Sequence, residues 1–120
     1  MIVKIKPYYE DEEVSLFFRT SKYANNGREC IRAFSITKDD GGEVFEPYAT
    51  LTVNLPFSEL PAPKLHGFYC FIDVNNCPWA EQMFLDTGIG IPTGESQCSG
   101  FCNYPVYFIF TSNLRKYRYS

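Results

Sequence analysis

The sequence has few of the features that mark a nucleic-acid-binding or membrane protein. Its 11 basic residues are outnumbered by 14 acidic ones, and a net charge of −3 provides no broad positive surface for DNA or RNA. No apolar run approaches the roughly 20 residues that a membrane helix needs. We therefore expect neither a membrane association nor a nucleic-acid partner, although the stretch from Arg115 to Tyr119 interleaves basic and aromatic side chains, as some single-strand binders do.

The sequence also lacks a recognisable catalytic arrangement of residues. Its one histidine, His66, lies in a proline-rich connection, where we expect a solvated side chain. A Gly-x-Ser-x-Gly nucleophile motif is missing, because Cys98 stands in the place of the second glycine. Asp86-Thr87-Gly88 matches the aspartic protease signature, but it ends a predicted helix, so we interpret it as a helix C-terminus with a glycine cap. We expect no catalytic residues, which favours a non-enzymatic protein.

Cysteine is present in an odd number. The first residues turn acidic after a short apolar stretch, so we expect no secretory leader and a cytoplasmic location. In that compartment the five cysteines are most simply interpreted as reduced thiols. The spacing of Cys70, Cys77, Cys98 and Cys102 does not match the short gaps of zinc fingers and ribbons. We predict no metal and no cofactor, and a Cys98–Cys102 disulfide only on oxidation.

Aromatic residues are what the sequence has in abundance. The chain contains 11 Phe and 9 Tyr, and aromatic side chains suit the half-buried faces of β-strands. Apolar or alternating stretches between turn residues predict strands at residues 2–6, 14–20, 30–37, 48–55, 68–74 and 104–110. Asn26-Gly27 and the segment 39–42 predict tight turns between antiparallel neighbours.

One helix is predicted before the last strand. Pro78 suits a first helical position and Gly88 a left-handed C-terminal cap, so the helix should cover about residues 78–87. Its apolar face would consist of Trp79, Ala80, Met83 and Phe84. The predicted fold class is therefore α+β, an antiparallel sheet of about five strands with this helix packed on one face. By its length the chain, residues 1–120, should form a single domain.

The segments that follow this helix are predicted to be irregular. Gly88, Gly90, Pro92 and Gly94 indicate a glycine-rich loop over residues 88–100. Phe101 is expected to tuck into the core at its end. Residues 112–120 are expected to form a short tail, flexible or partly docked.

Polar residues in two predicted loops are the candidate ligand-binding residues. One group precedes the helix and the other lies in the glycine-rich loop: Asp73, Asn75, Asn76, Thr93, Gly94, Ser99 and Gly100. Such residues either satisfy backbone groups of turns and caps or form the rim of a binding site. If they form a site, a concave pocket should join the two groups.

Two segments carry a family resemblance. The first is residues 48–56, YATLTVNLP. The second includes Asp73-x-Asn75-Asn76-x-Pro78-Trp79-Ala80, Thr87-Gly88-Ile89-Gly90, Pro92-Thr93-Gly94 and Ser99-Gly100-Phe101-Cys102-x-Tyr104-Pro105-x-Tyr107. In this order and spacing they resemble a small bacterial family of single-domain proteins of unknown function, the DUF4313 type. Such proteins are common in genomes that carry conjugative and integrative elements. The resemblance covers about residues 14–110, and it implies a compact cytosolic domain with an accessory role in a mobile genetic element.

Three functions are consistent with the sequence. The leading hypothesis is a non-enzymatic interaction module that binds another protein through exposed aromatic side chains, because tyrosine is favoured at interfaces. The alternative is a small-ligand or anion-binding domain that uses the glycine-rich loop 88–100. The third is a cysteine-dependent enzyme or redox protein, in which a partly exposed cysteine would lie near His66 or a basic residue. The sequence leaves open whether the protein forms a homo-oligomer.

Overall fold

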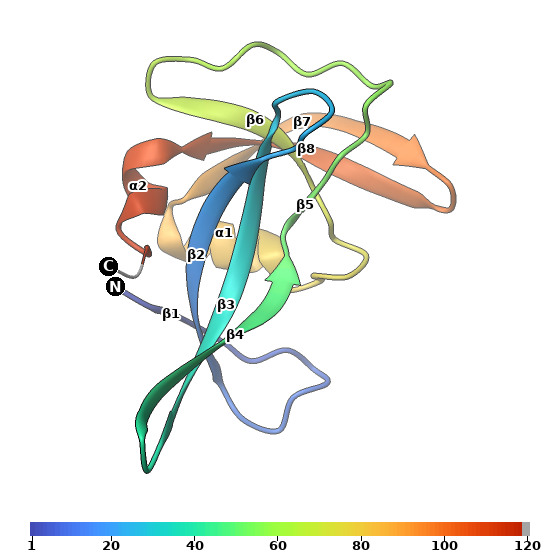
Figure 1. Ribbon diagram of the computed structural model, residues 1–120. Coiled ribbons are helices and arrows are strands. Elements are labelled where there is room, and N and C mark those ends of the chain that lie inside the picture. Colours follow the sequence, from blue (N-terminus) through green and yellow to red (C-terminus); the bar gives the residue numbers. More distant parts are fainter. Residues whose placement is uncertain (119–120) are drawn as a thin grey trace.

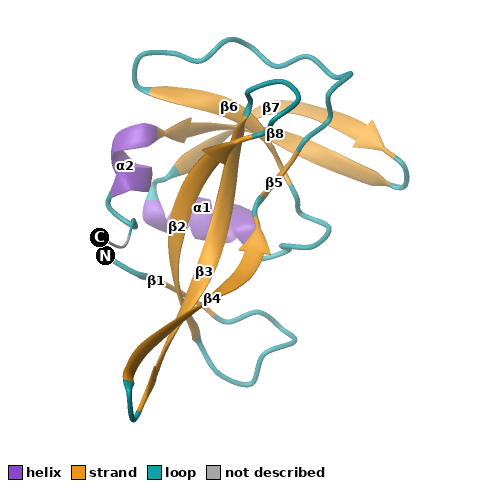
Figure 2. Ribbon diagram, in the orientation of Figure 1, coloured by secondary structure: helices purple, strands orange, loops and turns teal. Residues whose placement is uncertain are grey.

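The computed structural model describes residues 1–118, which fold mainly into β-strands (Figure 2). The first sheet contains, in spatial order, β1 (Val3–Ile5), β2 (Val14–Lys22), β3 (Glu29–Asp39) and β4 (Gly42–Thr50). The second sheet contains, in spatial order, β5 (Thr52–Val53), β6 (Gly67–Ile72), β8 (Cys102–Phe110) and β7 (Gly90–Ser99). Neighbouring strands are antiparallel in both. In Figure 1 the strands of the first sheet cross in front of those of the second.

This arrangement shows that the predicted α+β fold, one sheet of about five strands under a main helix, is wrong. The described chain has two four-stranded sheets, and its helices α1 (Ala80–Thr87) and α2 (Thr111–Arg115) are short. The change of sheet falls at Leu51, inside the segment 48–55 that the pattern predicts as one strand. Alternation identifies a strand, but it carries no information on which sheet that strand joins.

The two sheets meet at Leu51. Its N–H donates to the carbonyl of Ile31 on β3 at 2.8 Å, and its carbonyl accepts from the N–H of Asp73, just after β6, also at 2.8 Å. The next residue, Thr52, is buried, and its hydroxyl oxygen accepts a hydrogen bond from the N–H of Ile31 at 3.3 Å. The Tyr23 hydroxyl lies 2.9 Å from the same Thr52 oxygen. One residue therefore bonds to both sheets, and its neighbour reinforces the link to β3.

The turn predictions are confirmed. The turn at residues 23–27 is closed by hydrogen bonds from Tyr23 N–H to the Arg28 carbonyl and from Gly27 N–H to the Tyr23 carbonyl, each 2.8 Å. Gly27 has φ of 71°, which glycine adopts without strain. The β3–β4 turn begins at Asp39, whose carboxylate accepts from the N–H of Gly41 at 2.8 Å.

The predicted helix is confirmed, and it begins two residues later than expected, at Ala80. Helix α1 ends at Gly88, which has φ of 72° and donates its N–H to the Phe84 carbonyl, as expected of a left-handed cap. Ala80, Met83 and Phe84 are buried, and Trp79 is partly buried. The helix contacts β1 and β7, which are the outer strands of the two sheets. It therefore packs against an outer strand of each sheet.

The glycine-rich segment is a strand and the loop prediction is wrong there. Strand β7 pairs with β8, with a register shift between Pro92 and Ser96. Gly90 lies opposite Ile109 on one side of β8, and Gly67 of β6 lies opposite Phe110 on the other. Both glycines permit the backbones to approach β8 closely, so their role is steric.

The expected burial of Phe101 is also wrong. This residue lies at the tip of the β7–β8 hairpin and its side chain is fully exposed, because the hairpin projects from the body of the protein (Figure 1). The C-terminal segment is ordered as far as it is described: Leu114 is buried in α2, and the Phe18 N–H donates to the Tyr117 carbonyl at 2.9 Å. The expected tail is therefore docked up to residue 118, and residues 119–120 lie outside the described part.

Within residues 1–118, neither helix has the length and apolar character that crossing a membrane would require.

Replacing Gly67 with alanine should destabilise the second sheet. The added Cβ would collide with the carbonyl oxygen of Ile109 and with the ring of Phe108, so β6 or β8 would have to shift. We expect Gly67→Ala to lower the free energy of unfolding by about 1–3 kcal/mol in urea denaturation, the usual cost of overpacking. The matched control is Gly41→Ala, whose Cβ would lie 3.4 Å from the Asp39 carboxylate; it should change stability by less than about 0.5 kcal/mol. Equal effects of the two substitutions would contradict the steric role of Gly67.

The Tyr23 hydroxyl should make stability fall at alkaline pH. Burial raises the pKa of Tyr23 to about 12, and the nearby Cys30 and Cys70 thiols add to the shift while the Thr52 hydrogen bond opposes it. Because the unfolded pKa is about 10, the native state keeps this proton longer, and its stabilising effect is full below pH 10 and is lost as pH rises towards 12. Urea denaturation at pH 9 and 11 should therefore show a smaller loss of stability for Tyr23→Phe than for the wild type. A loss of the same size would rule out Tyr23 as a contributor.

Candidate functional site

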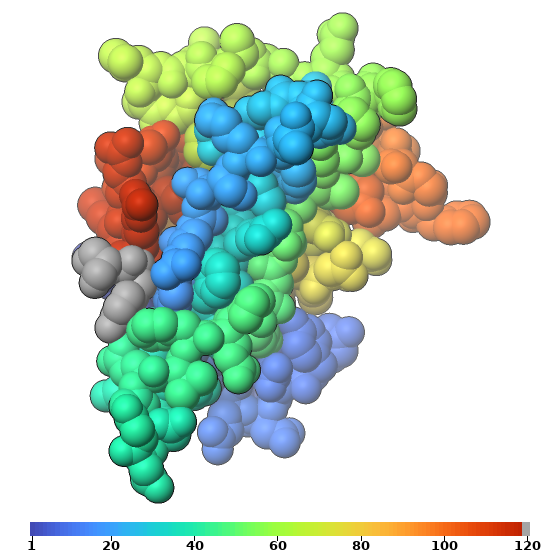
Figure 3. All heavy atoms as spheres, viewed as in Figure 1, coloured from blue at the N-terminus to red at the C-terminus, as the bar shows by residue number. Residues whose placement is uncertain are grey.

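The candidate site is an open cleft where three distant segments meet. These are the loop after β1, the end of β4 and the turn that follows β6, drawn in violet, green and yellow in Figures 1 and 3. The cleft has a volume of about 430 Å³ and is lined by Tyr9, Glu10, Tyr48, Ala49, Thr50, Asp73, Asn76 and Cys77. Its volume is within the range of about 300–1,000 Å³ usual for ligand pockets.

Aromatic side chains form one wall of this cleft and continue beyond it. The Trp79 indole N–H donates to the Tyr9 hydroxyl at 2.9 Å, and the ring centroids of Trp79 and Tyr48 are 6.2 Å apart. Tyr8 packs edge-on against Tyr9 with centroids 5.2 Å apart. Tyr9 is 50% exposed and Tyr8 is 89% exposed, so both present aromatic surface to solvent. The four rings hold the N-terminal loop against α1 and leave their outer faces free to contact a partner.

The polar part of the cleft is acidic. Glu10 and Asp73 contribute carboxylates, and none of the lining side chains is cationic. Asp11, Glu12 and Glu13 follow Glu10 in the same loop. Among residues 1–118, the cation bonded to this loop is Lys6, whose ammonium donates to the backbone carbonyl of Glu10 at 3.4 Å. Five carboxylates against one ammonium make this a region of negative charge.

The Asp73 carboxylate organises the turn that forms the floor of the cleft. One of its oxygens accepts from the Asn76 N–H at 3.2 Å, and the other accepts from the Asn76 side-chain amide at 2.9 Å. The Asp73 carbonyl accepts from the N–H of Cys77 at 2.8 Å, and the Cys77 thiol donates to the Thr50 carbonyl at 3.5 Å. These contacts stabilise the turn itself, and they also fix it against the end of β4.

The Tyr48 hydroxyl and the Cys77 thiol, both at the cleft, have raised pKa values and keep their protons near neutral pH. Burial raises the pKa of Tyr48, and the adjacent Tyr9 hydroxyl and Glu10 carboxylate raise it further. Tyr48 accordingly donates its hydroxyl proton to Glu10, with the oxygens 3.3 Å apart. Burial also raises the pKa of the Cys77 thiol to about 12, with a contribution from the Asp73 charge. Neither group is prepared to act as a nucleophile or base near neutral pH.

The structure separates the predicted ligand-binding residues into two groups. Asp73 and Asn76 line the cleft, and Asn75 is exposed in the same turn. The other four residues, Thr93, Gly94, Ser99 and Gly100, lie on the β7–β8 hairpin. There Thr93 donates its hydroxyl to the Val106 carbonyl at 3.0 Å and accepts the Glu95 N–H at 3.1 Å, while Gly94 and Gly100 have positive φ. The hairpin residues shape a bulge and a turn, and Thr93 lines a different pocket, beside His66.

Six lining residues of the cleft were not predicted as site residues: Tyr9, Glu10, Tyr48, Ala49, Thr50 and Cys77. Trp79, which lies beside the cleft and bonds to Tyr9, was not predicted either. The sequence assigns Tyr48 and Trp79 to apolar faces and treats Glu10 as part of a solvated charge run. A signal was present in the Tyr8-Tyr9 pair, because tyrosine is enriched at interfaces. Its partners, however, are up to 70 residues away in the sequence.

The cysteines do not form a catalytic arrangement with His66. Cys30, Cys70 and Cys77 are buried. Cys102 begins β8, whereas His66 packs against Phe108 and Phe110 near the other end of that strand. Six residues of strand between positions 102 and 108 correspond to about 20 Å. Within residues 1–118, no three His, Cys, Asp or Glu residues gather in a way that could hold a metal ion.

The hairpin register also opposes a Cys98–Cys102 disulfide. Cys98 pairs with Asn103, and Ser99 pairs with Cys102. Because side chains alternate between the faces of a strand, the two cysteines point to opposite sides of the hairpin. The Cys98 thiol instead donates to the Asn103 side-chain oxygen at 3.4 Å.

Thiol labelling should distinguish the cysteines. In native protein, Ellman's reagent should react quickly with exposed Cys98 and more slowly with Cys102, and the three buried cysteines should react only after unfolding. Cys98→Ser should remove the fast phase, and Cys102→Ser, as the matched control, should remove only the slow one. Reaction of more than two thiols in the native protein would contradict the observed burial.

Comparison with known proteins places the chain in a family. A family model described as a domain of unknown function, DUF4313, matches residues 17–120, whereas no curated protein and no solved structure matches. The match includes Tyr48 and Asp73 of the cleft and the adjacent Trp79, and it begins after Tyr9 and Glu10. Because it covers most of the sequence and agrees with the resemblance of the segments 48–56 and 73–107, this chain belongs to the DUF4313 family of domains of unknown function.

Proposed function

We propose that this protein is a non-enzymatic interaction module that binds a lysine- or arginine-bearing segment of a partner protein. The binding surface is the cleft around Tyr9, Tyr48 and Asp73. The observation that carries the proposal is the composition of this cleft, which combines exposed aromatic rings with carboxylates and includes no cationic lining residue.

This composition suits a cationic side chain. A Lys or Arg head group is attracted to the face of Trp or Tyr by about 0.5–1 kcal/mol at exposed sites, and more when it is desolvated. The Glu10 carboxylate adds a charge-assisted hydrogen bond, because the Tyr48 hydroxyl occupies only one of its oxygens. The apolar stem of a long cationic side chain can also lie along Tyr9 and Ala49.

The cleft is open, which favours a segment of a macromolecule over a buried cofactor. Tyr8 and Tyr9 extend the aromatic surface beyond the rim, where they can contact residues on either side of the bound cation. Tyrosine and tryptophan dominate the energetics of many protein interfaces. The raised pKa values of Tyr48 and Cys77 argue against either group acting as a nucleophile or base in this cleft near neutral pH.

The setting of this module is proposed from the family resemblance. The resemblance to proteins of the DUF4313 type implies a cytosolic accessory role in a bacterial mobile genetic element. A basic segment of another protein encoded by the same element would be a suitable partner. The small-ligand alternative remains compatible with the same cleft if the ligand is a cation.

The fluorescence of Trp79 provides a direct test, because it is the sole tryptophan of the chain and it contacts Tyr9. Titration with a (Gly-Lys)4 peptide whose termini are blocked, and therefore uncharged, should give a saturable change in Trp79 emission. The corresponding (Gly-Glu)4 peptide should give no change. Tyr9→Ala and Glu10→Gln should each weaken (Gly-Lys)4 binding by about two- to fivefold, the effect of one cation–π contact or one exposed charge. Raising the salt concentration should weaken binding further.

Glu59→Gln is the matched control, since Glu59 is exposed in the 56–66 connection and is not part of the cleft. It makes the same change in net charge and should leave the affinity unchanged. Equal weakening by Glu10→Gln and Glu59→Gln would mean that the peptide senses only net charge. That result, or the absence of saturation, would refute the proposed site.

A further inference from the structure

A second pocket lies between the two sheets and α2. It has a volume of about 220 Å³ and draws residues from β2, β3, β6 and the C-terminal segment: Phe18, Thr20, Glu29, Phe68, Thr111, Leu114, Arg115 and Arg118. Phe18, Phe68 and Leu114 are buried and form an apolar floor. Thr20 and Thr111 add hydroxyl groups, which can donate or accept hydrogen bonds.

Two arginines lie at the rim of this pocket. Arg115 and Arg118 are three residues apart in α2 and the turn after it, which places them on one side of the segment. Within residues 1–118, neither guanidinium has a hydrogen-bonding or ion-pair partner. With respect to the part of the chain that the structure describes, both guanidinium groups can donate to a bound anion.

The segment that carries the arginines is held at both ends. The N–H of Thr111 donates to the His66 carbonyl at 3.1 Å, which attaches the start of α2 to the residue before β6. The N–H of Phe18 donates to the Tyr117 carbonyl at 2.9 Å, which attaches the turn after α2 to β2. Leu114 between them is buried. This support reduces the ordering cost of binding, because the backbone of both arginines is already in place.

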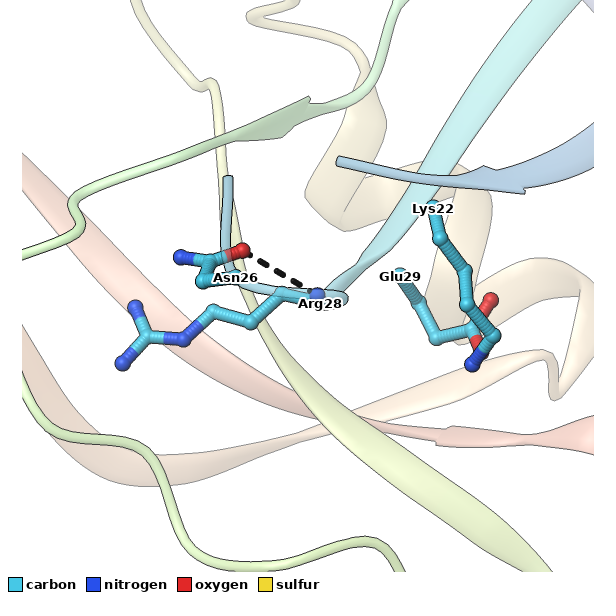
Figure 4. Close-up of polar contacts among 4 residues, drawn as sticks. All are labelled: Lys22, Asn26, Arg28 and Glu29. Carbon is cyan, nitrogen blue, oxygen red and sulfur yellow. Dashed lines mark hydrogen bonds and ion pairs between the residues drawn. The ribbon is translucent and has the colours of Figure 1, made fainter. Parts of the chain in front are cut away.

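The acidic lining residue of this pocket is already neutralised. Glu29 accepts a hydrogen bond from the Lys22 ammonium at 2.7 Å, and Figure 4 shows the two side chains lying alongside each other at the ends of β2 and β3. Arg28 extends away from this pair, and its guanidinium donates to the carbonyls of Leu55 and Ser58 at 2.9 and 2.6 Å. Arg28 thus anchors the 55–58 segment, and the pocket keeps the two positive charges of Arg115 and Arg118.

We propose that this pocket binds a small organic carboxylate with an aromatic or branched apolar body. The carboxylate is held by Arg115 and Arg118, whose planar donor groups match its two oxygens, and the body lies on Phe18, Phe68 and Leu114. The volume limits the ligand to about the size of benzoate. The apolar floor favours such an acid over an inorganic anion, which would leave the floor in contact with water. The pocket is separate from the acidic cleft, and all its residues lie within the family match at residues 17–120.

Amide chemical shifts of 15N-labelled full-length protein can test this assignment, with sodium benzoate as the probe. Benzoate should produce saturable shifts at Thr20, Phe68 and Leu114 with a dissociation constant of about 1–10 mM, as expected for a ligand of this size. Benzyl alcohol, which has the same ring without the charge, should bind at least about tenfold more weakly. Sodium phosphate, which has charge without a ring, should not saturate these residues in the same concentration range.

Substitutions then identify the anion contacts. Arg115→Gln and Arg118→Gln should each weaken benzoate binding by about tenfold, whereas Lys116→Gln, an exposed position of the same segment outside the pocket, should have no effect. If one arginine substitution disturbs the spectrum of the free protein, the other provides the test. The proposal is overturned if benzoate shows no saturation, if benzyl alcohol or phosphate binds as tightly, or if Lys116→Gln weakens binding as much as the arginine substitutions do.

Discussion

The backbone hydrogen bonds of Leu51 join the two sheets of this protein. Its N–H bonds to Ile31 of the first sheet, and its carbonyl bonds to Asp73 at the end of the second. Leu51 is fully buried, and a buried peptide group without a partner costs about 1–3 kcal/mol. Both sheets must therefore be in place for this residue to be satisfied. The side chain of Thr52 strengthens the junction, because its hydroxyl oxygen accepts a hydrogen bond from the Ile31 N–H and lies within hydrogen-bonding distance of the Tyr23 hydroxyl.

The acidic cleft is a consequence of this junction. Because Leu51 bonds to Asp73, the end of β4 lies beside the turn that follows β6, and the Cys77 thiol closes the contact at Thr50. The N-terminal loop then completes the cleft through Trp79 and Tyr48, which bond to or contact Tyr9 and Glu10. One part of the cleft therefore lies inside the family match, and the N-terminal part lies before it. In this arrangement the shape of the cleft is set by the fold, while much of its negative charge comes from the loop.

The protein has two surfaces of opposite charge, an acidic cleft and a pocket with two arginines, which its net charge does not reveal. The cleft at residues 9–10, 48–50 and 73–77 carries carboxylates and aromatic rings, whereas the pocket at α2 carries two arginines above an apolar floor. A chain with a net charge of −3 can therefore present an attractive site for a cation and another for an anion. The arginine pocket depends on the C-terminal segment being docked through Phe18 and Tyr117.

Local structure could be predicted from the sequence: strands β1, β2, β3, β6 and β8, the turns at Gly27 and Gly41, and helix α1 with its Gly88 cap. These features depend on interactions between residues close in the chain, such as an Asn-Gly turn or a glycine in the left-handed conformation. The division into two sheets, the pairing of β7 with β8 and the exposure of Phe101 could be seen only in the three-dimensional structure. The tertiary structure also decided which candidate residues meet, since Asp73 and Asn76 join Tyr9 and Glu10 while Thr93 and Ser99 lie elsewhere. Each of these outcomes depends on contacts between distant segments, such as the hydrogen bond from Trp79 to Tyr9. Hydrophobic periodicity indicates that a side chain is buried, but it does not indicate which residue that side chain contacts.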